Sequence, residues 1–123
     1  MDKVRKENFQ LLSMTDENVQ LILVYISSKC PLADVVSEMQ EILRPDKKVI
    51  VTGDFNFDKS VENDLTKYLT SKRMVQLVTN PTHDKGNCID HCYVPEELKE
   101  NVVLKQYSPY YSDHDALCIS LKL

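Results

Sequence analysis

Acidic, amide and imidazole side chains stand at three places where apolar segments of the chain end. They are Asp54, Asn56, Asp90, Asp113 and His114. Loops at one edge of a sheet can bring such groups together while the sheet holds them rigid. Carboxylates hold a hard cation that stabilises charge on a phosphate, and a base deprotonates the attacking water. A donor near the leaving group completes what hydrolysis of a phosphodiester needs.

Strands must position these groups, and the first two are expected to form a hairpin. The apolar runs 9–14 and 19–26 flank the polar turn 15–18, which predicts an antiparallel pair. The second run, VQLILVYI, is almost continuously apolar. This pattern predicts a central strand that is buried on both faces.

Two helices are expected next. Pro31 fits the first turn of a helix whose apolar residues, within 32–43, share one face, and Pro45 ends it. Asp58 or Ser60 would cap the second helix. The inner face of that helix would comprise Val61, Leu65, Tyr68 and Leu69.

Further strands are expected between and after the helices. They are 48–52, 88–94, 102–106 and 116–121, with a helical turn at 95–100 and loops at 79–87 and 107–113. Strands and helices alternate irregularly and some strands are adjacent, which indicates an α/β (α+β) sandwich with a mixed sheet. The length of 123 residues, without repeat or linker, suits one domain.

Composition and charge limit the classes of function. The net charge is -4, from 15 Lys and Arg against 19 Asp and Glu, which gives no support for a stoichiometric DNA-binding module. An enzyme that meets phosphate through a metal ion remains compatible with this charge. The four cysteines lack secreted-type spacing, and no signal peptide or membrane-spanning run occurs. We expect free thiols and an intracellular location, cytoplasmic or nuclear.

A zinc site is the rival interpretation of the segment that contains Asp90. His83, Cys88, His91 and Cys92 are all zinc-ligand types, but their spacing does not match paired CxxC motifs. Alternation along a strand puts Cys88 and Cys92 on one face and His91 on the other. We therefore expect no zinc site here, and a packing or surface role for His91, which points away from Asp90.

Four segments, in order, resemble motifs of the endonuclease/exonuclease/phosphatase superfamily. GDFN at 53–56 is similar to its GD-[hydrophobic]-N signature. LVYIS at 23–27 resembles its Tyr-bearing strand, NPTHDKGNCIDHCYV at 80–94 its PT…ID…V segment, and YSDHDAL at 111–117 its terminal SDH motif. The resemblance is closest to endonuclease modules of mobile elements. It implies a deoxyribonuclease-I-like fold, here a partial four-layer α/β/β/α sandwich.

The resemblance also implies roles for the residues that match. Asp54 would position and deprotonate water and, with Asn56, contact a Mg²⁺ or Mn²⁺ ion. Asn56 would also hold Asp54 or the phosphate through its amide. Asp113 would be a direct metal ligand. His114 would hydrogen-bond the scissile phosphate, and Asp90 would fix its tautomer and orientation.

Three further residues carry weaker expectations. Tyr25 would reach the phosphate with its hydroxyl, or would be an aromatic residue of the sheet. Thr82 and His83 would line the substrate groove. Asp54 on its own could also be a turn residue after Gly53, whereas a carboxylate such as Asp90 in an apolar strand is costly without a partner.

The superfamily's full domain is longer than this chain. Its N-terminal half supplies an Asn and a metal-binding Glu, and neither Glu7 nor Glu17 sits in the corresponding context. We therefore expect residues 1–123 to be a truncated domain, the C-terminal half, with an uncovered apolar face. Metal binding would be weak, and phosphodiesterase activity of the isolated chain low or absent.

Several alternatives stay open at this stage. DNA is the expected substrate, but the same scaffold hydrolyses inositol phosphates and sphingomyelin, because a fold can be inherited while the substrate changes. The chain could instead be a catalytically dead interaction module, or a non-functional mobile-element remnant that does not fold alone. The oligomeric state does not follow from the sequence.

Overall fold

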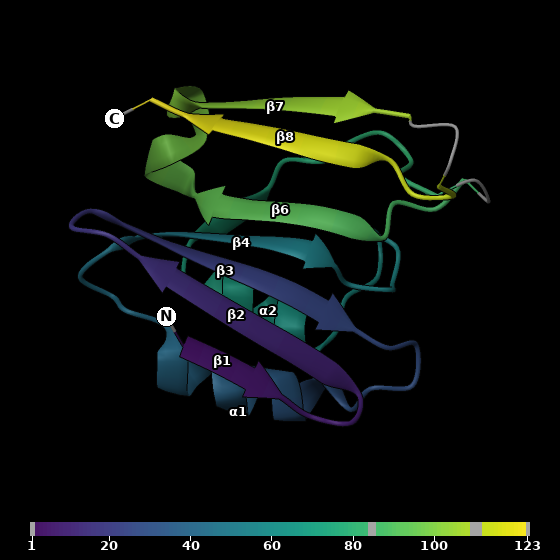
Figure 1. Ribbon diagram of the computed structural model, residues 1–123, viewed down its shortest axis with the longest axis horizontal. Coiled ribbons are helices and arrows are strands. Elements are labelled where there is room, and N and C mark those ends of the chain that lie inside the picture. Colours follow the sequence, from purple (N-terminus) through teal and green to yellow (C-terminus); the bar gives the residue numbers. More distant parts are fainter. Residues whose placement is uncertain (1, 84–85, 109–111, 123) are drawn as a thin grey trace.

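The computed structural model describes residues 2–83, 86–108 and 112–122. Within them, a six-stranded mixed sheet has the strand order β1-β2-β3-β4-β6-β5 (Figure 1). The strands are β1 (Asp2–Arg5), β2 (Phe9–Thr15), β3 (Val19–Ile26), β4 (Lys48–Asp54), β5 (Met74–Gln76) and β6 (Asp90–Pro95). Strands β3 and β4 pair in parallel, whereas the other neighbours pair antiparallel, so the expected β2–β3 hairpin is confirmed.

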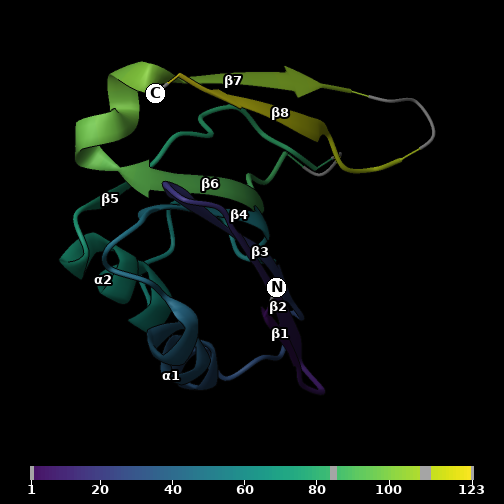
Figure 2. The same ribbon diagram turned by 60° about the vertical axis from the view of Figure 1, so that its left-hand side comes forward.

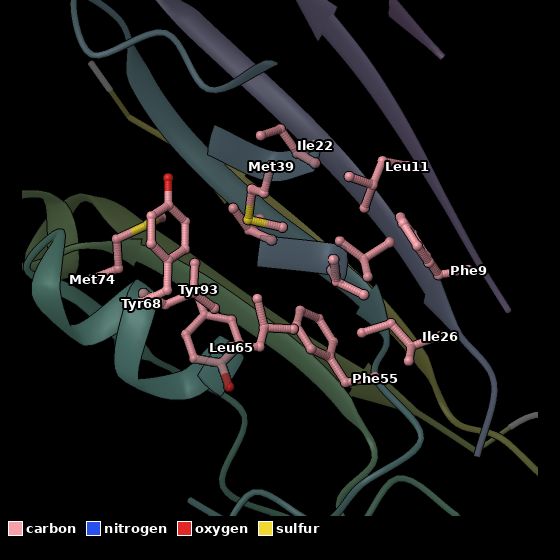
Figure 3. Packing of buried hydrophobic residues seen from close by; sticks show 14 of the residues in the cluster. Phe9, Leu11, Ile22, Ile26, Met39, Phe55, Leu65, Tyr68, Met74 and Tyr93 are labelled. Atoms are coloured by element: carbon pink, nitrogen blue, oxygen red, sulfur yellow. The ribbon is translucent and has the colours of Figure 1, made fainter. Parts of the chain in front are cut away.

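Helices α1 (Leu32–Ile42) and α2 (Asp64–Ser71) cover one face of this sheet (Figure 2). Apolar side chains from β2, β3, β4, β6 and both helices form the main core between them (Figure 3). Its fully buried members include Leu11, Ile22, Ile26, Met39, Phe55 and Leu65. Burial of each such side chain stabilises the fold by about 1.5–3 kcal/mol. No helix in the described part of the chain has the length and apolarity to cross a membrane.

A small second sheet lies on the opposite face. After the 3-10 helix η1 (Glu96–Asn101), strands β7 (Val102–Tyr107) and β8 (Ala116–Leu121) form an antiparallel pair. Alternate side chains of this pair pack with Ile50, Val78, Cys92 and Val94 of the main sheet and its connections. Figure 2 shows the resulting order of layers, which is helices, main sheet and small sheet. The expected α/β fold with a mixed sheet is confirmed.

The small sheet leaves part of the main sheet uncovered. An apolar groove of about 500 Å³ runs between β8 and the main sheet, lined among others by Leu21, Ile50, Leu117 and Ile119. Leu23, which also lines this groove, is 37% exposed, and Tyr25 is 48% exposed. The expectation that β3 is buried on both faces is therefore wrong. Alternate residues of β3 are buried against the helices, but no layer within the described residues covers Leu23 and Tyr25.

The second helix begins later than expected. Its cap is Asn63, whose side chain accepts from the backbone N–H of Thr66 in a capping box, so a cap at Asp58 or Ser60 is wrong. The Asp58 carboxylate instead accepts from the backbone N–H of Cys88 at 2.8 Å and thereby ties this loop to the segment before β6. Val61, expected on the inner face, is 44% exposed because it precedes the helix.

Other boundaries differ in smaller ways. Strand β4 continues through Gly53 and Asp54, two residues beyond the expected end. Strand β6 begins at Asp90 and not at residue 88. Strands β1 and β5 form the two edges of the main sheet, and neither is among the expected strands. The expected loop 107–113 contains residues 109–111, which lie outside the described residues.

Candidate active site

Three adjacent strands place candidate side chains in a row. In the parallel register of β3 and β4, Tyr25 is opposite Asp54. In the antiparallel register of β4 and β6, Asp54 is opposite Asp90. Paired residues point to the same face of a sheet. The three side chains therefore share the face that carries the small sheet, at one end of its apolar groove.

His114 reaches this row from the turn before β8. Its Nδ1 lies 2.9 Å from Asp90 Oδ2, and since a carboxylate only accepts, Nδ1 carries the proton. The other ring nitrogen, Nε2, lies 3.9 Å from Asp54 Oδ2 and 4.0 Å from Asp113 Oδ1. Asp90 thus fixes the tautomer and ring direction of His114 and leaves Nε2 beside the two other carboxylates.

The turn that carries His114 is held by a carboxylate that the sequence analysis did not single out. Asp115 accepts from Gln106 Nε2 at 2.6 Å and from Ser108 Oγ at 2.8 Å. Its backbone N–H donates to the carbonyl of Thr82 at 2.7 Å. The second acid of the DHD segment, 113–115, was the available signal for this residue. Asp115 positions His114 by fixing the backbone that follows it.

Thr82 is buried and acts within the protein. Its side-chain oxygen accepts from the backbone N–H groups of Ile89 at 3.1 Å and Asp90 at 3.0 Å. Thr82 therefore fixes the start of β6, where Asp90 lies, and its side chain is only 1% exposed. His83, next to it, forms an isolated antiparallel β-bridge with His114, and the two imidazole rings meet in an edge-on contact. Of the two residues expected to line the groove, His83 is the one at the site.

The loop after β4 directs Asp54 toward the site. Asn56 has a left-handed backbone, with φ of 58°, a conformation that Asn tolerates better than most residues. Its backbone N–H donates to Asp54 Oδ1 at 3.0 Å, and its side-chain amide donates to the carbonyl of Ile26 at 2.9 Å. Asn56 therefore ties the end of β4 to the end of β3, and its contact with Asp54 comes from the main chain.

Two candidates of the rival zinc set lie in the interior. His91 is buried, stacks on Phe55 with ring centroids 4.8 Å apart, and its Nε2 lies 2.9 Å from the carbonyl of Cys88. Cys92 packs in the separate cluster under the small sheet. The expected packing role of His91 is confirmed, and the two side chains point to opposite faces of the main sheet.

Two groups of the site, Asp54 and His114, have raised pKa values. Partial burial raises the pKa of Asp54, and the negative charge of the neighbouring Asp90 raises it further. The hydrogen bond to Asp90 raises the pKa of His114, and the charges of Asp90, Asp54 and Asp113 act in the same direction. The site thus disfavours ionisation of Asp54 beside the negative charge of Asp90, and it favours positive charge on the His114 imidazole.

Replacing Asp90 with Asn is expected to lower the pKa of His114, because the change removes the carboxylate that accepts from Nδ1. An NMR titration of the His114 ring signals measures this pKa directly. Asp46→Asn, an equal charge change in an exposed turn, is the matched control and should leave the His114 pKa in place. An unchanged His114 pKa in the variant would show that Asp90 does not control this imidazole.

Divalent cations fit the donor set of this site. Asp54, Asp90 and His114 offer ligand atoms within 4.8 Å of one another, as do His83, Asp113 and His114. Carboxylate oxygens are the ligands that Mg²⁺ and Mn²⁺ prefer, and a cation would relieve the repulsion that raises the Asp54 pKa. Asp54 belongs to the first group and Asp113 to the second, and each has an oxygen within 4.0 Å of His114 Nε2, whereas Asp90 is engaged by His114. No glutamate of the described residues belongs to either group.

Residues 19–118 match the sequence model of the endonuclease-reverse transcriptase family. The chain belongs to the endonuclease-reverse transcriptase family. The match includes all of the candidate residues above, from Tyr25 to His114. Among curated protein sequences, none matches the chain. Membership in this family gives the chain a nucleic-acid phosphodiesterase fold.

Solved structures agree with the family in fold. The endonuclease domain of TRAS1, a telomere-specific non-LTR retrotransposon, superposes with a TM-score of 0.72 at 16% identity, over 99% of this chain and 67% of that one. The cytolethal distending toxin of Actinobacillus actinomycetemcomitans superposes with a TM-score of 0.66 at 19% identity, over 91% of this chain and 52% of that one. The cytolethal distending toxin of Haemophilus ducreyi superposes with a TM-score of 0.62 at 14% identity, over 99% of this chain and 56% of that one. The chain thus spans between half and two thirds of these structures, and the expected deoxyribonuclease-I-like fold is confirmed.

Proposed function

We propose that this endonuclease-reverse transcriptase family chain carries the hydrolytic centre of a divalent-metal-dependent endonuclease that cleaves phosphodiester bonds in DNA. The observation that carries the proposal is the arrangement of Asp90, His114 and Asp54. One carboxylate fixes an imidazole whose second nitrogen faces another carboxylate. The similar solved structures include a retrotransposon endonuclease domain, which supports nucleic acid as the substrate class.

In the proposed reaction, Asp54 orients the attacking water and accepts its proton. The raised pKa of Asp54 suits this step, because a stronger base takes the proton more readily once the carboxyl group is ionised. His114 Nε2 donates a hydrogen bond to a phosphate oxygen and, as imidazolium, stabilises the charge that develops there. Asp90 keeps the Nδ1 proton in place throughout.

Asp113, Asp54 and Asn56 are the proposed metal-ligand set. Mg²⁺ or Mn²⁺, when bound, supplies positive charge to the phosphate and lowers the pKa of water. Asp113 suits a direct ligand role because its carboxylate is exposed beside His114 Nε2. The exposed Tyr25 hydroxyl is a proposed phosphate donor, because Tyr25 stands beside Asp54 on an uncovered face.

The isolated chain is proposed to act slowly. Two carboxylates, Asp54 and Asp113, remain for the cation once Asp90 is engaged by His114. The chain covers only 67% and 52% of two of the solved structures that it resembles. We propose a reducing compartment, cytoplasm or nucleus, because all four cysteines are free.

Two measurements on the purified chain test the function together. The first is thermal unfolding with Mg²⁺, with Mn²⁺ and with a chelator, and the second is nicking of supercoiled plasmid DNA with the protein in excess. We expect a cooperative transition that either cation shifts upward, since an ion that binds the folded state stabilises it, together with slow, chelator-sensitive nicking. A cooperative transition that neither cation shifts would favour a dead interaction module. A broad transition with dye binding to apolar surface would favour a remnant.

A further inference from the structure

A second cluster shares His114 and Asp113 with the candidate active site and adds His83 to them. It consists of His83, Asp113 and His114. His83 Nε2 lies 3.1 Å from Asp113 Oδ2, and His114 Nε2 lies 4.0 Å from Asp113 Oδ1. The two imidazole rings are nearly perpendicular, with centroids 5.0 Å apart. Two nitrogen ligands and one carboxylate thus converge on one space.

The spacing of this cluster is close to that of a tetrahedral metal site. Bonds of about 2.0–2.2 Å to Zn²⁺ put neighbouring ligand atoms roughly 3.3–3.5 Å apart. The separation of His83 and Asp113 is already slightly shorter than this. The 4.0 Å between His114 Nε2 and Asp113 Oδ1 needs to close by about 0.5–0.7 Å for the same bond lengths. No pair of ligand atoms, all within 4.8 Å, needs to close by more than about 1.5 Å. The Asp113 side chain is 61% exposed, so it can move without disturbing the core.

The backbone holds the two imidazoles together before any metal arrives. His83 and His114 are partners in an isolated antiparallel bridge, and the neighbouring N–H of Asp115 donates to the carbonyl of Thr82. Asp90 accepts from His114 Nδ1, and a carboxylate in this position is the usual orienting partner of a metal-binding histidine. Such preorganisation lowers the conformational entropy that binding must overcome.

We infer that His83, Asp113 and His114 form a binding site for a borderline transition-metal ion, Zn²⁺ foremost, with water in the fourth position. Two imidazoles with one carboxylate is a donor set that suits Zn²⁺ and not Mg²⁺, which prefers oxygen ligands. The proton that His83 Nε2 shares with Asp113 moves to Nδ1 or to solvent when the ion takes its place. This set differs from the rejected cysteine-containing one and shares only His83 with it.

Zinc at this site opposes the proposed nuclease reaction. The ion occupies His114 Nε2 and Asp113, which the reaction assigns to the phosphate and to Mg²⁺. This consequence rests on the proposed function, whereas the binding itself does not. The site is therefore tested by binding, without nucleic acid and without an activity measurement.

Calorimetric titration of the full chain with zinc chloride tests the inference. The parent protein carries Cys30→Ser and Cys118→Ser, so that the two thiols outside the core do not contribute. We expect one equivalent to bind, and both His83→Asn and Asp113→Asn to weaken the affinity by about tenfold or more. Asp46→Asn, an equal charge change in an exposed turn, is the matched control and should leave the affinity unchanged.

Two further measurements, of NMR signals and of the unfolding temperature, distinguish the possible outcomes. In the parent protein, zinc should shift the NMR signals of the His83 and His114 rings and leave those of His91 in place. The Mg²⁺-induced rise in unfolding temperature should survive His83→Asn while zinc affinity falls. The proposed zinc site would be wrong if His83→Asn left the zinc affinity unchanged. It would also be wrong if zinc had no effect on the NMR signals of either ring. Failure of plasmid nicking alone overturns the nuclease proposal and leaves the zinc site standing.

Discussion

Replacing Asp54 with Asn is expected to lower metal-dependent nicking of plasmid DNA by about 10²–10⁴-fold, the range for loss of a positioned general base. The amide cannot accept the proton of the attacking water, and it offers one oxygen where the carboxylate offers two. Asn keeps the size of the side chain and the contact from the Asn56 backbone N–H. The loss therefore reports the charge and basicity of Asp54.

The fold should not suffer from this change. Because the pKa of Asp54 is raised in the folded chain, its ionised form is disfavoured there. That penalty grows as the pH rises above the ordinary pKa of Asp, and Asn does not carry it. Asp54→Asn should consequently unfold at the same temperature as the parent or higher, measured at neutral pH without metal. Asp46→Asn, at the other end of β4, is the matched control for nicking, and equal activity of the two variants would contradict the role of Asp54.

The site could largely be predicted from the sequence because strands fix side-chain direction. A polar residue at the end of an apolar strand occupies a defined position, and strand pairing then brings such positions together. Asp54 and Asp90 meet for this reason, and Tyr25 joins them through the parallel pairing of β3 with β4. The segments that carry these residues retain the order of the family's motifs.

Loop residues could not be assigned in the same way. Thr82 lies in a polar segment and was expected to face substrate, yet its hydroxyl accepts two backbone N–H groups in the interior. Asp58, Ser60 and Asn63 are all suitable cap residues. The contact that decides between them, from Cys88 to Asp58, joins segments that are distant in sequence. Local pattern carries no information about such contacts.

The burial of β3 shows a limit of a different kind. An apolar strand indicates that a layer covers both faces, but it does not reveal which chain supplies the layer. Leu23 and Tyr25 belong to such a strand and are exposed in the described structure. The apolar groove beside β8 continues this uncovered surface. The pattern of β3 therefore predicted a cover on both faces, and the described residues supply it on one face along the whole strand.

Gly53→Ala is expected to destabilise the fold by about 3 kcal/mol or more, because backbone strain and a steric clash combine. Gly53 has φ of 147°, and a Cβ there would lie 2.0 Å from the carbonyl oxygen of Val24. Val24 is its partner in the parallel pairing of β3 with β4, so the clash is with backbone and no side chain can relieve it. Separation of the two strands would also move Tyr25 away from Asp54.

Gly86→Ala is the matched control for this change. Gly86 also has a positive φ, of 86°, but a Cβ there meets no atom within 4 Å. The control therefore carries a positive-φ penalty without a clash, about 1–2 kcal/mol. The larger loss expected for Gly53→Ala reports the close approach of β4 to β3 together with the more extreme φ of Gly53. Denaturant unfolding of both variants gives the two free energies. Equal losses of unfolding free energy would mean that the contact with Val24 adds no cost. The register of Tyr25, Asp54 and Asp90 would then not depend on glycine at position 53.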